Sequence, residues 1–384
     1  MSHETDGRTF VFMLVLISMI ILWENKVKSI SSSVFALALG MAVSLAWRTA
    51  TETSFDFAPE IFLFLLLPPM LLNSSFSFEV DSLRKNWMGS LTFAFFGTLF
   101  SMIWIACGLL VWGRGTSVEM SVVQAFLFAS VLAPTDTVAT MSLTRSLDIR
   151  DKYIFKVLEN ESVVNDALAI VLVRLFSSME KTDRSMDRWI PVEVMFWSVL
   201  STFFSAALGG TAARLLNKYG PTTMTMHYMS ALLIYGACEG LQLSGVLGLF
   251  VYGSIVEAPD AFRESVSSIS AIVEAYVYLM LGLALHTYEW SWLWVSLLTF
   301  VSCVVGRVLM TFIIGSCLRA CGREQWTPKS MLFFSMCGVR GAISYALSMS
   351  LHNSFIKSTT FVVIVCTIFV FGTLQRCLLR MLLM

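Results

Sequence analysis

Residues 161–166 are the most informative part of the chain, and they read Glu161-Ser162-Val163-Val164-Asn165-Asp166. Two carboxylates and a carboxamide lie here inside a run that is otherwise apolar enough to cross a bilayer. Ionisable groups at that depth cost free energy, so they usually face a bundle interior or an aqueous cavity and serve a function. In a helix, Glu161 and Asn165 share one face, and Asp166 lies on the adjoining flank. We therefore expect a buried polar cluster.

The composition indicates that the whole chain lies in a membrane. Hydrophobic residues make up 57% of the 384 positions, charged residues only 14%, and the mean hydropathy is +0.75. Because one crossing needs roughly 20 apolar residues, we expect an all-α polytopic protein with about 13 transmembrane helices. The predicted spans are residues 10–23, 30–47, 57–75, 88–112, 122–141, 157–178, 190–216, 226–238, 243–257, 268–286, 291–318, 330–350 and 358–380.

Charge and cysteine usage exclude several functions. The net charge is zero, so nothing indicates nucleic-acid binding. Neither the eight Cys nor the four His form a convincing ligand pattern, so we expect no transition-metal site and no cofactor. Lys and Arg are more frequent in the loops that hold Lys26, Arg84, Arg150 and Lys329. The positive-inside rule then predicts a cytoplasmic C-terminus and an N-terminus that is outside or lumenal.

The number of spans predicts an internal repeat. Six spans, one extra span and six more make the second half start on the opposite side from the first, which is the arithmetic of two inverted six-helix repeats. The fifth span carries Ala133-Pro134-Thr135-Asp136-Thr137 and the twelfth carries Cys337-Gly338-Val339-Arg340-Gly341-Ala342. Both stretches contain a helix breaker and a charge near mid-membrane. We expect a pair of crossing broken helices at this point.

The residues at these breaks have a specific physical role. Pro134 removes one backbone donor, while Gly338 and Gly341 permit unwinding, and the freed backbone groups need polar partners. Asp136 is expected near the positive end of one half-helix and Arg340 near the negative end of another. The alternative is a proline kink with a buried structural ion pair.

Six blocks of the sequence carry a resemblance to a known family. They are Leu67-Pro68-Pro69, Pro134-Thr135-Asp136, Glu161-Ser162-Val163-Val164-Asn165-Asp166-Ala167, Leu243-Ser244-Gly245-Val246-Leu247, Gly306-Arg307 and Gly338-Val339-Arg340-Gly341-Ala342. In this order the blocks resemble the signatures of monovalent cation/proton antiporters, in the sodium/proton exchanger branch.

The resemblance implies an architecture of two domains. A dimerisation domain would comprise residues 1–75 and 226–286, and an ion-transporting core residues 88–178 and 291–384, joined by a linker helix at 190–216. It also implies a homodimer whose cores slide as elevators past the fixed domains. The expected partners are the second copy, membrane lipids and cytoplasmic regulators. The expected location is a plasma membrane or an acidic organelle membrane.

The same resemblance assigns residues to an ion site. Asp166 matches the carboxylate that binds a cation or a proton, and Asn165 is its uncharged neighbour. Thr135 and Asp136 match the unwound crossing that completes the site. Oxygen ligands of this kind suit an alkali cation, so Asp166, Asp136 and Thr135 are the predicted ligands of a transported Na⁺, K⁺ or Li⁺.

Further charged residues are expected to support this site. By resemblance Arg307 pairs with Glu161, and Arg340 belongs to the twelfth-span crossing. Glu239 and Glu274 match acidic family positions, where they either line an entry funnel or form structural pairs. Arg174 is expected to extend toward the outer end of its span.

Two features bear on the mechanism. Burial disfavours a charged carboxylate, so protons and cations are expected to compete for Asp166. Because Asn165 replaces a second aspartate, we expect electroneutral exchange of one proton per cation. Asn160 and Met310 stand where the family often has Gly and Asn, and the absent Asn predicts a looser polar network around Glu161.

Three alternatives remain open at this stage. One is a potassium/proton exchanger, and another is a homologue that does not transport. The third is an enzyme of another class, an intramembrane aspartyl hydrolase in which Asp136 and Asp166 share a proton. The sequence favours a transporter over an enzyme, because hydrolysis gives no reason for paired breaks in two distant spans.

Overall fold

The computed structural model describes residues 15–20, 32–48, 62–77, 80–113, 120–136, 152–181, 190–219, 223–287, 289–351 and 353–383. These residues form helices of several kinds, with no strand among them, which confirms the all-helical class. Only residues 15–20 of the first predicted span are described. Lys26 and Arg150, which contributed to the predicted orientation, lie outside the described residues.

The helices account for most of the predicted spans. The π-helices are η1 (Phe62–Leu66) and η2 (Thr92–Gly97), and η2 joins two α-helices into one continuous helical segment. The α-helices are α2 (Ser32–Arg48), α4 (Leu67–Ser77), α5 (Val80–Leu91), α6 (Thr98–Gly113), α7 (Val122–Leu132), α9 (Lys152–Lys181), α10 (Ile190–Lys218), α11 (Met224–Gly240), α12 (Gly245–Ile255), α13 (Asp260–Leu283), α14 (Leu293–Ala320), α15 (Pro328–Met336), α16 (Ala342–Ser350) and α17 (Ser354–Leu383).

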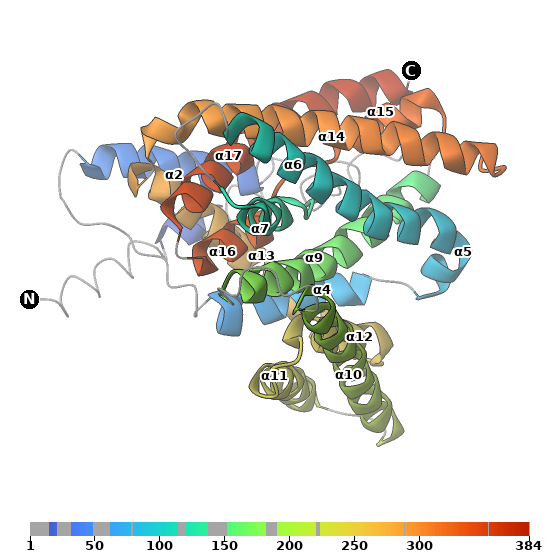
Figure 1. Ribbon diagram of the computed structural model, residues 1–384. Coiled ribbons are helices and arrows are strands. Elements are labelled where there is room, and N and C mark those ends of the chain that lie inside the picture. Colours follow the sequence, from blue (N-terminus) through green and yellow to red (C-terminus); the bar gives the residue numbers. More distant parts are fainter. Residues whose placement is uncertain are drawn as a thin grey trace, which may run out of the picture.

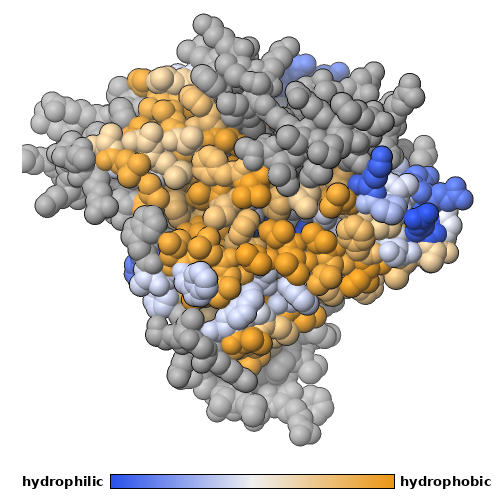
Figure 2. Space-filling view, turned by 90° about the horizontal axis from the view of Figure 1, so that it is seen from above, coloured by the Kyte–Doolittle hydropathy of each residue, from blue (hydrophilic) through white to orange (hydrophobic). Residues whose placement is uncertain are grey.

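Five helical segments are long and apolar enough to cross a membrane. They are Asn86–Gly113, Tyr153–Glu180, Asp260–Leu283, Leu293–Ala320 and Ser354–Phe371. Figure 2 shows a largely hydrophobic face with hydrophilic residues gathered toward one edge. Large apolar side chains on α6 and α14, such as Ile103 and Val301, are about half exposed at 50% and 52%. Such surfaces suit contact with lipid.

The helices pack into two groups. In the first group, α2 and α4 pack against α13, while α12 packs against α4, α10 and α11. In the second, α5, α6, α7 and α9 pack with one another, and α14 packs against α6, α15 and α17. Figure 1 shows α14 beside α6, with α10, α11 and α12 at the other end of the molecule. We call these the α13 group and the α14 group.

Glycines bring α2 and α13 into backbone contact. A Cβ atom at Gly40 would lie 2.4 Å from the carbonyl oxygen of Leu279, and one at Gly282 would lie 2.5 Å from that of Leu37. No larger side chain fits at either position. Close approach through small residues is a common way to hold helices together in membranes. Helix α13 is therefore fastened tightly to α2.

Candidate functional site

Both predicted breaks are present, and they meet. Helix α7 ends at Leu132 and is followed by non-helical backbone at residues 133–136, while residues 337–341 separate α15 from α16. The backbone N–H of Asp136 donates to the carbonyl of Val339 at 2.7 Å. Two segments about two hundred residues apart thus satisfy part of each other's freed backbone. We call residues 133–136 and 337–341 together the crossing.

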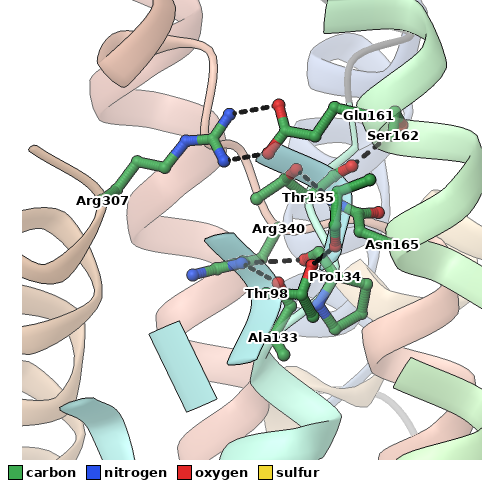
Figure 3. Close-up of polar contacts among 10 residues, drawn as sticks. Thr98, Ala133, Pro134, Thr135, Glu161, Ser162, Asn165, Arg307 and Arg340 are labelled. Atoms are coloured by element: carbon green, nitrogen blue, oxygen red, sulfur yellow. Dashed lines mark hydrogen bonds and ion pairs between the residues drawn. The ribbon is translucent and has the colours of Figure 1, made fainter. Parts of the chain in front are cut away.

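Arg340 stabilises the crossing from within. Its guanidinium Nη1 donates to the carbonyls of Ala133 at 2.7 Å and Pro134 at 3.0 Å, as Figure 3 shows. The side chain is only 1% exposed. These carbonyls follow the C-terminal end of α7, where a helix presents unpaired acceptors and partial negative charge. Arg340 therefore lies at the negative end of the broken helix, as the sequence predicts.

Asp136 lies at the start of α16. Its side chain packs so closely on Gly341, the N-cap of α16, that a Cβ atom there would come within 2.2 Å of Oδ2. The positive end of α16 favours a negative group at this place. The hydroxyl of Tyr278 donates to the same Oδ2 at 2.7 Å. Sequence reasoning missed Tyr278, although a tyrosine one helical turn after the intramembrane Glu274 is a usable signal.

Helix α9 meets the crossing through Thr135. The amide nitrogen of Asn165 donates to Oγ1 of Thr135 at 2.7 Å, and the hydroxyl of Ser162 donates to its carbonyl at 2.9 Å. Figure 3 shows these side chains of α9 pointing toward the crossing. Asn165 is 1% exposed, yet its Oδ1 has no hydrogen-bond partner among the described residues. Ser162 is a second contact that the sequence analysis did not assign.

Asp166 differs from its neighbour in accessibility. Asn165 is buried, whereas Asp166 is partly exposed on the adjoining flank of α9. The carboxylates of Asp136 and Glu161 lie close enough to repel a charge on Asp166. The predicted site residues Asp166, Asn165, Thr135 and Asp136 are thus brought together. Their oxygen atoms are of the hard type that alkali cations prefer.

Glu161 and Arg307 form a buried two-bond ion pair. Arg307 Nη2 donates to Glu161 Oε2 at 2.8 Å, and Nη1 donates to Oε1. The two side chains are 1% and 3% exposed, and the guanidinium lies 5.1 Å from the ring centroid of Phe334. Both oxygens of Glu161 are bound, whereas Nε of Arg307 is buried without a hydrogen-bond partner among the described residues, and Met310 belongs to a buried apolar cluster. The looser network around Glu161 stays a prediction.

The two remaining acidic candidates, Glu239 and Glu274, lie on helices of the α13 group, and each accepts a hydrogen bond. Glu239 of α11 accepts a hydrogen bond from Arg174 of α9 at 2.5 Å, and Arg174 also donates to the carbonyl of Leu243. Arg174 lies near the C-terminal end of α9, and its side chain reaches the end of α11 and the turn that follows it, so its extension toward the outer end of its span stays a prediction. Glu274 accepts from the hydroxyl of Ser33 at 2.8 Å.

Broken helices that meet at a buried cluster of carboxylates define an integral, multi-pass membrane transporter. A family model described as "Sodium/hydrogen exchanger, transmembrane" matches residues 12–384. The chain belongs to this family. Its members exchange ions and are not enzymes, so the hydrolase alternative is wrong.

Individual relatives agree with this assignment. Sodium/hydrogen exchanger 8 of Mus musculus is 25% identical over 99% of this chain and 73% of its own length. Sodium/hydrogen exchanger 5 of Arabidopsis thaliana is 26% identical over 88% of this chain and 71% of its own. The solved structure of the sodium proton antiporter MjNhaP1 from Methanocaldococcus jannaschii at pH 8 matches with a TM-score of 0.77. It covers 99% of both chains at 17% identity, and it shows the same fold.

Proposed function

We propose that this protein exchanges one Na⁺ for one H⁺ across a membrane, at a site centred on Asp166. The observation that carries the proposal is the position of Asp166 on α9, beside the crossing that holds Thr135 and Asp136. Its relatives bear the name sodium/hydrogen exchanger, which supports sodium as the cation. Lithium or potassium would use the same oxygen ligands, so the experiment below includes both.

The charges of the site support electroneutral exchange. Asp136, Glu161 and Asp166 contribute three negative charges, and Arg307 and Arg340 contribute two positive charges, which leaves one negative charge uncompensated. One proton or one monovalent cation neutralises the cluster, and a neutral cluster costs least in a low-dielectric interior. The site with a bound proton and the site with a bound cation then carry the same charge. Exchange between them moves no net charge across the membrane.

The packing of the helices supports an elevator-type mechanism. The α14 group holds the crossing, Asp166 and both buried arginines, and its helices pack mainly on one another, while apolar side chains of both groups share one buried core. We assign the α14 group to the moving core and the α13 group to a dimerisation domain, with α10 as linker. The full architecture is then about 13 transmembrane helices in two inverted repeats, in a homodimer with a cytoplasmic C-terminus and an N-terminus outside or lumenal. A plasma membrane or an acidic organelle is the proposed location.

The test is proton flux out of proteoliposomes that contain a pH-sensitive dye, since a cation added outside enters in exchange for internal protons. Sodium, lithium or potassium is added outside, with the membrane voltage clamped by an ionophore for an ion other than the one added. We expect a sodium-dependent dye response that is independent of the clamped voltage. Asp166→Asn should abolish it, while the matched variant Asp260→Asn, at the exposed start of α13, should keep it.

Several outcomes would overturn parts of this proposal. Transport that persists in folded Asp166→Asn protein would exclude Asp166 as the site. A response that grows with the clamped voltage would exclude electroneutral exchange. A dye response to potassium alone would show that the exchanged cation is potassium and not sodium. Folded native protein that responds to no cation would indicate a homologue that does not transport.

A further inference from the structure

Tyr278 joins the crossing to a helix of the other group. It lies on α13, it is 1% exposed, and its hydroxyl donates to Asp136 Oδ2 at 2.7 Å. Asp136 belongs to the crossing in the α14 group, whereas α13 packs chiefly on α2 and α4. The bond therefore links a carboxylate of the candidate site to a helix that carries none of the predicted ligands.

Helix α13 is held firmly while it makes this bond. Its backbone touches that of α2 at Gly282, so the helix has little freedom to follow a movement of the crossing. Glu274, one turn before Tyr278, is bound to Ser33 of α2 at 2.8 Å. Tyr278 thus occupies the boundary between a fixed surface and the site.

The charged groups around this hydrogen bond come from three elements. Glu274 of α13 and Asp136 of the crossing both act electrostatically on the Tyr278 hydroxyl. Asp166 lies on α9 and Asp136 in the crossing, and their negative charges repel each other. The nearest positive charge of the crossing is Arg340, whose Nη1 is engaged by the carbonyls of Ala133 and Pro134. The backbone of Ala342, at the positive start of α16, also hydrogen-bonds the Tyr278 hydroxyl. The phenol is therefore a donor to a carboxylate oxygen, with acidic groups on one side and the start of α16 on the other.

We propose that Tyr278 is a positioning residue that sets the cation affinity of the transport site by competing for Asp136. The inference rests on the proposed function and adds a residue to it. A hydroxyl that donates to a carboxylate occupies lone-pair density that a cation or a proton would otherwise use. Before Asp136 can bind either ion fully, this hydrogen bond must weaken. The phenol thus lowers the affinity of the site for both ions.

The test uses Tyr278→Phe, which removes only the hydroxyl and keeps the buried ring. Because hydrogen bonds to charged groups are stronger than neutral ones, we expect the KM for sodium to fall by about tenfold to a hundredfold. The pH of half-maximal rate should rise, since protons also bind more tightly, and the maximal rate should not fall. Tyr276→Phe, the same change two residues earlier on α13, is the matched control and should leave KM unchanged.

Two results would overturn the inference. One is an unchanged or raised KM in Tyr278→Phe, including the case in which only the maximal rate falls, as a structural defect would produce. The other is an equal decrease of KM in Tyr276→Phe.

Sodium-dependent thermal stabilisation of the purified protein provides a second readout that needs no transport. We expect Tyr278→Phe to reach half-maximal stabilisation at a lower sodium concentration than the native protein. If native protein is stabilised by sodium but moves no protons, the proposed exchange fails while the affinity of Tyr278→Phe still tests the inference.

Discussion

Two sets of polar contacts in this molecule differ in kind. Inside the α14 group, Arg307 holds both oxygens of Glu161, and Arg340 holds two carbonyls, with side chains no more than 3% exposed. Between the groups, Tyr278 donates a hydrogen bond to Asp136, and the side chains of Arg174 and Glu239 are 42% and 20% exposed.

This difference separates permanent contacts from exchangeable ones. Breaking a buried charge pair leaves a charge without compensation in a low-dielectric interior, which is strongly unfavourable. Breaking an exposed pair changes little, because water replaces the lost partner. We conclude that the buried network keeps the site intact, while the exposed pair of Arg174 and Glu239 can break at little cost.

The largest expected effect is on the buried pair. Arg307→Ala leaves Glu161 buried without its partner, so we expect about 3–5 kcal/mol of destabilisation and little folded protein. Thermal unfolding in detergent measures this effect. Replacing both partners, with Arg307→Met and Glu161→Gln together, should recover most of the stability because no buried charge remains. If the double variant is no more stable than Arg307→Ala, the cost does not come from an uncompensated charge.

A smaller effect is expected at the crossing itself. Gly341→Ala places a Cβ atom where Asp136 Oδ2 lies, at 2.2 Å, so the two broken segments must move apart. Overpacking of this kind costs about 1–3 kcal/mol, and we expect proton flux to be lost at the same time. Gly240→Ala is the matched control, since nothing lies within 4 Å of a Cβ atom there. Normal flux in Gly341→Ala would show that the close approach is not needed for transport.

The smallest effect is expected for the exposed pair between the groups. Arg174→Ala should change the free energy of unfolding by less than about 1 kcal/mol. The same thermal unfolding assay gives a direct comparison with Arg307→Ala. A loss of stability as large as that of Arg307→Ala would show that the contacts between the groups are not the exchangeable ones.

The sequence predicted the parts of the site that depend on local chemistry. Pro134 removes a backbone donor, and Gly338 and Gly341 favour unwinding beside a mid-membrane charge, so both breaks were correctly located. The spacing of Glu161 and Asn165 also placed both on one side of α9. The helix bounds followed from hydropathy to within a few residues for α10, α12 and α14.

The sequence could not provide contacts that depend on how distant helices pack. Tyr278 and Asp136 are 142 residues apart, and nothing local to either indicates that they meet. The partner of Arg174 could not be predicted for the same reason, because Glu239 lies 65 residues further along. Nothing in the sequence distinguishes Ser162 from other small polar residues in an apolar helix, because its role depends on the hydrogen bond to the carbonyl of Thr135.

The most direct test of the central claim is the sodium dependence of proton flux at several external pH values. If cations and protons share the carboxylates around Asp166, acidification should raise the KM for sodium, by up to about tenfold per pH unit, and leave the maximal rate unchanged. A maximal rate that falls with acidification while KM stays constant would contradict the account, because protons would then act at a separate site.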